Sequence, residues 1–79
     1  MNAPKKARVA TRVVDGVRWR SLRFGRWVAE VDAVPVQVDA TYFRATRDGW
    51  NVSVNGEHKT HDRTLERAMR SAARYARKG

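Results

Sequence analysis

Apolar and polar residues alternate along most of the first sixty positions, which is typical of β-strands that bury one face. In Trp50-Asn51-Val52-Ser53-Val54, for example, the apolar residues at every second position are expected in the core and the polar residues between them in water. The strands predicted in this way cover residues 9–14, 17–24, 26–31, 41–46 and 50–54, with a brief return strand over 57–60. The pattern predicts a small antiparallel sheet of about four to five short strands.

Turn-forming residues separate these runs. Asp15-Gly16 and Asn55-Gly56 predict tight hairpins, and Arg47-Asp48-Gly49 predicts a further turn. The alternating run 34–38 contains Pro35, which cannot donate to a strand ladder, so this run is expected at a sheet edge or in a connection.

The second strand changes phase along its length. Val17 and Trp19 share one parity, whereas Leu22 and Phe24 share the other. This change predicts a bulge or bend near Ser21, where one extra residue would re-aim the strand.

A helix is predicted at the end of the chain, because the apolar residues from position 65 recur with helical spacing. These residues are Leu65, Ala68, Met69, Ala72, Ala73 and Ala76. Thr64 or Asp62 can cap the helix, and Glu66 lies favourably near its positive end. The predicted fold is therefore α+β, with residues 9–79 as a single domain in which one C-terminal helix packs on one face of the sheet. Residues 1–8 are expected to form a disordered basic arm.

Charge adds a functional signal to this fold. The 79 residues carry 17 basic and 8 acidic side chains, a net charge of +9. The charge is segregated: the net charge is +6 over residues 1–30, −1 over 31–60 and +4 over 61–79. A basic footprint of this kind attracts polyanions. Thirteen of the basic residues are arginine, whose planar guanidinium binds phosphate through two hydrogen bonds.

Two groups of arginines are candidates for contacting nucleic acid. One group recurs every three or four residues along the predicted helix: Arg63, Arg67, Arg70, Arg74 and Arg77. The other is interleaved with aromatic residues on the predicted strands: Arg18, Arg20, Arg23 and Arg26. Exposed aromatic residues beside cations can stack on bases. In a chain this short, however, Trp19, Phe24, Trp27 and Trp50 are expected to form the core.

The sequence gives little support to catalysis or metal binding. His58 and His61 form an H-x-x-H pair, but a structural zinc site needs four ligands and the chain has no cysteine. Phosphate-binding loops and nucleophile elbows are absent. We expect no enzymatic activity, no cofactor and no metal site. No run approaches the roughly 18 apolar residues of a membrane span, and a cytoplasmic location is expected.

Part of the chain resembles a known family. The run from Phe43 to Gly56 (FRATRDGWNVSVNG) and, after a short gap, Arg63-Thr64-Leu65-Glu66-Arg67-Ala68 resemble small HicB-like antitoxin domains. This resemblance covers residues 43–77 and implies a toxin partner and dimerisation. The sheet-plus-helix outline also resembles the three-stranded DNA-binding modules at the ends of phage integrases and double-stranded RNA-binding domains.

Two functional hypotheses follow. The first is a small non-enzymatic nucleic-acid-binding protein, with DNA preferred over RNA, that acts as an accessory or regulatory factor and contacts phosphates through both groups of arginines. The second is a protein-interaction module, antitoxin-like or a phage-encoded inhibitor, that binds an acidic protein. A homodimer is a further expectation, because the run around Pro35 is predicted to leave a strand edge exposed.

Overall fold

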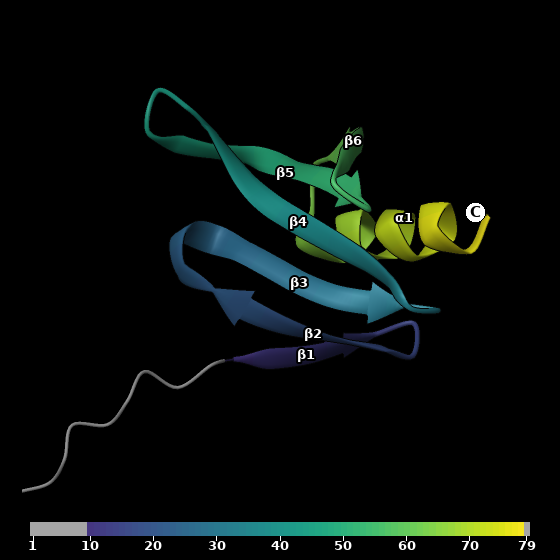
Figure 1. Cartoon of the computed structure of the whole chain (residues 1–79). Helices are drawn as coiled ribbons and strands as arrows, with labels where there is room; N and C mark the ends of the chain where they lie inside the picture. Colours follow the sequence, from purple (N-terminus) through teal and green to yellow (C-terminus); the bar gives the residue numbers. More distant parts are fainter. Residues whose placement is uncertain (1–9, 79) are drawn as a thin grey trace, which may run out of the picture.

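Six strands follow one another along the chain, and each pairs antiparallel with the next (Figure 1). The computed structural model describes residues 10–78. The strands are β1 (Thr11–Val14), β2 (Val17–Leu22), β3 (Arg26–Val31), β4 (Val34–Phe43), β5 (Thr46–Val54) and β6 (Glu57–Asp62). A short 3₁₀ turn, η1 (Arg23–Gly25), joins β2 to β3, and the helix α1 (Leu65–Lys78) follows β6. The predicted α+β class with an antiparallel sheet and one C-terminal helix is confirmed, but the sheet has six strands, more than predicted. The arm predicted for residues 1–8 lies outside the described residues.

The four hairpin turns share one backbone conformation. Each has two central residues with positive φ, as in a type I′ turn, which matches the twist of the strands it joins. The turns are Asp15-Gly16, Asp32-Ala33, Arg44-Ala45 and Asn55-Gly56. Since the connections alternate, the η1 corner and the β4–β5 turn lie at one end of the sheet and the other three turns at the opposite end (Figure 1).

The turn predicted at residues 47–49 is wrong. The chain reverses at Arg44-Ala45, where Phe43 pairs with Thr46, and Gly49 lies inside β5 next to a β-bulge. Gly49 has a φ of 150°, and a Cβ atom there would lie 2.6 Å from Cε1 of His61. Glycine is therefore needed at position 49 because the His61 ring approaches the backbone closely, and not because the chain turns there.

Pro35 does not mark a sheet edge. It belongs to β4, which lies between β3 and β5 in the interior of the sheet. The ladder between β4 and β5 begins only at Val36, paired with Val54, so the missing N–H of Pro35 falls beyond its end. The Pro35 carbonyl still accepts a hydrogen bond of 2.8 Å from the Asn55 N–H. The edges of the sheet are β1 and β6.

The bulge or bend predicted near Ser21 does not occur within β2, and the chain bends only after Leu22, in η1. Burial alternates regularly through β2, with Val17 and Trp19 buried and Arg18 and Arg20 exposed. Leu22 then faces away from the core, with 43% of its surface exposed. Register shifts occur instead between Thr41 and Tyr42 and between Val52 and Ser53.

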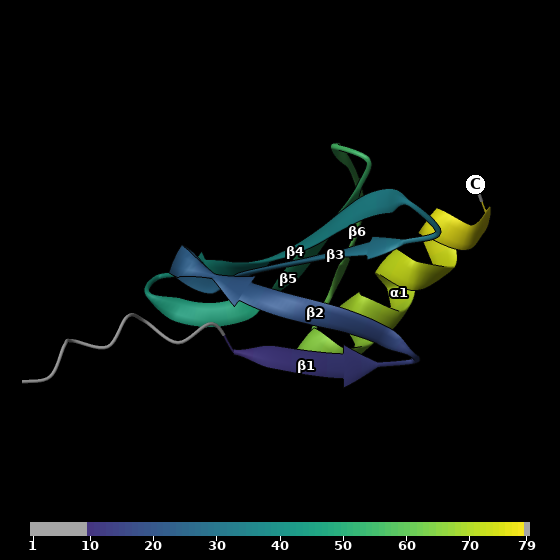
Figure 2. The same cartoon turned by 60° about the horizontal axis from the view of Figure 1, so that its bottom comes forward.

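The core lies between one face of the sheet and α1 (Figure 2). The largest fully buried side chains are those of Trp19, Val38, Val52 and Met69. The helix contributes a stripe of small residues, which lets it lie close to β4 and β5. Trp50 is buried and Trp27 is partly buried, as predicted, whereas Phe24 is 91% exposed and is not part of the core.

Polar contacts fix the start of α1. Thr64 caps the helix, because its Oγ1 accepts a hydrogen bond of 3.3 Å from the Arg67 N–H. Ser71 is buried and donates a hydrogen bond of 2.9 Å to Oδ2 of Asp62, which ties the helix to the end of β6. Across residues 10–78, α1 is too short and too polar to cross a membrane, and the structure contains no other α-helix there.

Candidate nucleic-acid interface

The predicted site residues fall on two basic surfaces that lie on opposite sides of the sheet. We call the first the sheet surface: it is formed by Arg18, Arg20 and Arg26 on the face that α1 leaves uncovered. The second, the helix surface, is the outward side of α1 and comprises Arg67, Arg70, Arg74, Arg77 and Lys78, and Arg63 lies in the bend that precedes the helix. Arg23 lies in η1, at the corner between β2 and β3. All of these residues are exposed.

The alternation of side chains along β2 determines which arginines point to the sheet surface. Side chains along a strand point alternately to the two faces, and Trp19, which is completely buried, points toward the helix. Arg18 and Arg20, on either side of it, must therefore point to the open face. The register places Arg20 between Thr11 of β1 and Val28 of β3. A buried indole thus fixes the backbone from which both guanidinium groups project.

A shallow groove of about 550 Å³ runs over the sheet surface. The ladder between β2 and β3 holds three residue pairs and ends at Arg20 and Val28, and beyond that point the groove contains Arg18 and Glu30. Gln37 of β4 and Ser53 of β5 add hydrogen-bonding groups to its wall. Within residues 10–78, no carboxylate lies within 4.0 Å of the guanidinium of Arg18 or Arg20. Both arginines are available to an external anion.

Arg26 is held by neighbouring side chains. Its Nε donates a hydrogen bond of 2.7 Å to Oδ1 of Asp39, its partner across the β3–β4 ladder. Oδ2 of Asp39 accepts a second hydrogen bond, of 2.8 Å, from Nε2 of Gln37. Because Asp39 neutralises its charge, Arg26 contributes less free charge to the sheet surface than Arg18 and Arg20.

The two histidines of β6 lie at the far side of the open face. Nε2 of His61 is 3.0 Å from Oγ1 of Thr41, which is within hydrogen-bonding distance. His58 is exposed and pairs with Ser53 across the β5–β6 ladder. Among residues 10–78, no three His, Cys, Asp or Glu side chains gather in a group that could hold a metal ion.

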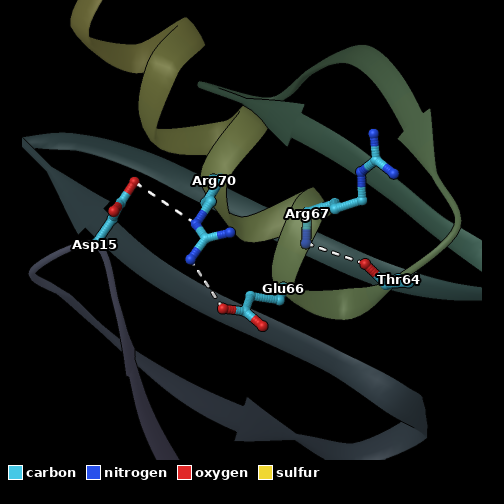
Figure 3. A network of polar contacts seen from close by, with 5 residues as sticks. All are labelled: Asp15, Thr64, Glu66, Arg67 and Arg70. Atoms are coloured by element: carbon cyan, nitrogen blue, oxygen red, sulfur yellow. Dashed lines mark hydrogen bonds and ion pairs between the residues drawn. The ribbon is translucent and has the colours of Figure 1, made fainter.

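The helix surface is opposite the buried stripe of α1, because residues three and four apart share a helix side. Arg70 lies at its centre between two carboxylates (Figure 3). Its Nη2 is 2.9 Å from Oε2 of Glu66, and its Nε is 4.0 Å from Oδ2 of Asp15 in the β1–β2 turn. The side chain of Arg67 points away from this group (Figure 3). Within the described part of the chain, Arg67, Arg74 and Arg77 form no ion pair.

The second half of α1 and the β1–β2 turn enclose a hollow of about 460 Å³. Its lining consists of Asp15, Arg70, Arg74, Arg77 and Lys78, which is four cations against one carboxylate. The helix C-terminus carries partial negative charge, which favours cations there. The C-terminal part of the helix surface is therefore basic and borders a hollow.

Sequence reasoning missed a third feature, an exposed aromatic end formed by Phe24, Tyr42 and Phe43. These rings are 91%, 56% and 64% exposed, and they belong to η1 and to the end of β4, at the same end of the sheet. Gly25 brings the two segments together, since a Cβ there would lie 2.9 Å from Cβ of Ala40 and 3.9 Å from the Tyr42 hydroxyl. The Arg44 guanidinium lies over the Phe43 ring, 5.2 Å from its centroid. A usable signal was the adjacent pair Tyr42-Phe43, because neighbouring residues of a regular strand cannot both face the core.

Comparison with known proteins gives no significant match to a family model, a characterised protein or a solved structure. The resemblance of residues 43–77 to HicB-like antitoxin domains stays a prediction. In the fold this stretch contains β5, β6 and α1 as far as Arg77, and so includes the helix surface except Lys78.

Proposed function

We propose that this protein binds duplex DNA as a non-enzymatic accessory or regulatory factor, with Arg18 and Arg20 as its principal contacts. The observation that carries the proposal is a pair of unneutralised arginines at alternate positions of β2, projecting from the uncovered face of the sheet. Completely buried Trp19 separates them and holds the strand in place. A contact residue on a packed strand loses little freedom on binding, which favours affinity.

The spacing of the two arginines suits a duplex. Residues two apart on an antiparallel strand are separated by about 6.8 Å, and successive nucleotides of one DNA strand by about 3.4 Å, so the pair spans roughly two base steps. The major groove of B-DNA admits β-strands, and arginine is the side chain that most often reads guanine there. A-form RNA has a deep, narrow major groove that side chains cannot read. Strand-borne arginines therefore favour DNA over RNA.

The neighbouring residues suit a supporting role at the same surface. Arg26, oriented by Asp39, and Arg23 at the η1 corner extend the cationic surface along the β2–β3 hairpin. Gln37 and Ser53 in the groove provide neutral hydrogen-bonding groups. Phosphate contacts of this kind fix position on the duplex, whereas base contacts specify sequence.

The proposal is tested by fluorescence anisotropy with short labelled duplex DNA, single-stranded DNA and duplex RNA. For about six phosphate contacts, affinity for duplex DNA should fall by roughly three decades between 50 and 200 mM salt. The double variant Arg18→Ala/Arg20→Ala should weaken duplex binding at least about tenfold, because each arginine contributes about 1–3 kcal/mol. The slope of log affinity against log salt concentration should become less steep by about two, one for each cation removed. Neither arginine forms an ion pair with the described residues, so the variant should fold normally.

The matched control is Arg67→Ala/Arg74→Ala, which removes the same charge from the opposite side of the molecule. When the DNA concentration is kept well below the Kd, this control should change the Kd by less than about threefold. A change of that size is the effect expected from a general loss of positive charge. An unchanged Kd in the sheet variant would overturn the assignment of the sheet surface. A salt-independent Kd, or no binding to any of the three nucleic acids at 50 mM salt, would overturn DNA binding itself.

The aromatic end favours a second candidate, a protein-interaction module with an acidic partner. Protein interfaces are enriched in aromatic residues and arginine, and Phe24, Phe43 and Arg44 present this combination to solvent. This function predicts that Phe24→Asn/Phe43→Asn leaves the Kd for duplex DNA unchanged. It also predicts that an acidic protein recovered from nuclease-treated lysate binds the purified wild-type protein and fails to bind this variant.

A further inference from the structure

The helix surface and the sheet surface face away from each other. Helix α1 covers one face of the sheet (Figure 2), so its outward side faces away from the sheet. The burial alternation of β2 places the sheet arginines on the opposite, uncovered face. A duplex is a rod about 20 Å in diameter and resists sharp bending over short lengths. A duplex seated on the sheet surface therefore leaves the helix surface accessible to solvent.

Most of the positive charge on the helix surface is not neutralised by the described residues. Glu66 and Asp15 both approach Arg70, and Asp62 on the neighbouring strand accepts a hydrogen bond from Ser71. The other cations of the helix surface form no ion pair within residues 10–78. Like charges three and four residues apart on a helix repel each other, so the free protein keeps a repulsion that a bound polyanion would relieve.

The shape of the surface suits a phosphate backbone. Arg74, Arg77 and Lys78 line the hollow of about 460 Å³ beside the β1–β2 turn, and Arg67 extends the row toward the start of α1. Over α1 the arginines follow one side of the helix for more than two turns, about 15 Å at 1.5 Å per residue. One DNA strand carries a phosphate about every 3.4 Å along the duplex axis, so a row of this length can meet several of them.

We infer that the helix surface binds a second nucleic-acid segment, so that one molecule bridges two duplexes. The inference rests on the proposed DNA binding by the sheet surface and extends it from one segment to two. The sheet surface holds one duplex through Arg18 and Arg20. The helix surface holds the other through phosphate contacts of Arg67, Arg74 and Arg77, without reading its sequence.

A capture experiment separates bridging from simple binding. Duplex DNA immobilised on beads is incubated with the full-length protein and a second, fluorescent duplex, and the fluorescence retained on the beads is measured. The wild-type protein should retain the second duplex. Arg67→Ala/Arg74→Ala/Arg77→Ala should reduce retention at least tenfold, while its anisotropy Kd for a single short duplex, which the principal contacts Arg18 and Arg20 determine, stays within about threefold of wild type.

The matched control Arg67→Lys/Arg74→Lys/Arg77→Lys keeps the charge and should restore retention, because phosphate contact needs a cation more than a particular geometry. Circular dichroism of all variants checks that α1 is intact. If the alanine variant retains the second duplex as wild type does, the bridging inference is overturned: two protein molecules, each bound through its sheet surface, would then hold the duplexes together. If wild-type protein binds a single duplex but retains no second one, bridging is overturned and the proposed DNA binding stands. If the protein binds no single duplex, the proposed function fails, and the bridging inference fails with it.

Discussion

Phe24 combines two costs that a residue with only a structural role would avoid. Its backbone adopts φ 60° and ψ 35°, the left-handed region that bulky residues rarely enter, and its ring is 91% exposed. Residues held in this region cost about 1–3 kcal/mol, and an exposed ring recovers little through burial. The fold therefore does not need phenylalanine here, and the ring is available to a partner.

We predict that Phe24→Asn leaves the free energy of unfolding unchanged or raises it by up to about 1 kcal/mol, because asparagine tolerates the left-handed region better. Urea denaturation followed by fluorescence measures this. Phe43→Asn is the control: it removes another exposed ring, 64% exposed, from the end of a strand, where β-propensity is lost and no left-handed strain is relieved. A loss of more than 1 kcal/mol in Phe24→Asn would show that the ring packs against the protein.

Single residues differ in how well the sequence places them. Period-two alternation correctly assigns Trp19 and Trp50 to the core, since each lies in a regular strand. It fails for Phe24 because the chain leaves the strand at Leu22, and alternation has no meaning inside η1. The exposure of that ring depends on a local left-handed conformation that the hydrophobic pattern does not encode.

At the level of elements, the turns show where sequence signals are strong and where they are weak. Asp15-Gly16 and Asn55-Gly56 were predicted because they contain the residues that positive φ favours. Arg44-Ala45 has no such residue, and the nearby Asp48-Gly49 attracted the prediction instead. The register of the β4–β5 hairpin follows from the pairing of two long strands, and this pairing overrides the weak local preference of its turn.

A substitution in the Asp32-Ala33 turn is expected to increase the stability of the fold. Ala33 has a φ of 67°, a conformation that costs an L-residue about 1–2 kcal/mol. We predict that Ala33→Gly raises the free energy of unfolding by about 0.5–1 kcal/mol, the strain relieved minus the extra backbone entropy of glycine. Denaturant titration measures the change. Ala29→Gly, in the middle of β3, should lower stability by a similar amount, and equal effects of both substitutions would contradict this explanation.

At the level of the whole molecule, strand parity explains why the predicted site divides in two. The helix packs on the face to which Trp19 points, so Arg18 and Arg20 must lie on the other face. This step needs only the sequence together with the assumption that the helix covers the buried face. The sequence separates the helix arginines from the strand arginines but assigns them no faces, and the hollow beside the β1–β2 turn and the Arg26–Asp39 pair depend on three-dimensional packing.

The net charge of +9 should also limit stability. The described residues form four ion pairs, too few to offset the repulsion among the cations. We predict that the Tm rises by a few degrees between 50 and 200 mM sodium chloride, because salt screens this repulsion. Thermal unfolding by circular dichroism measures the shift. Arg18→Gln/Arg20→Gln should show a higher Tm at low salt and a smaller rise, and a Tm that falls with salt would contradict the prediction.

The order of the elements along the chain has a consequence for protein synthesis. Each strand pairs with its neighbour in sequence, so the hairpins can form one after another as the chain leaves the ribosome. The apolar face of that sheet, with Trp19, Val38 and Val52 at its centre, has no cover until α1 is made. During this interval the nascent sheet exposes an aggregation-prone apolar face, and a chain that stops before Leu65 leaves this face permanently exposed. The last segment of the described fold thus decides whether the nascent protein stays in solution or aggregates.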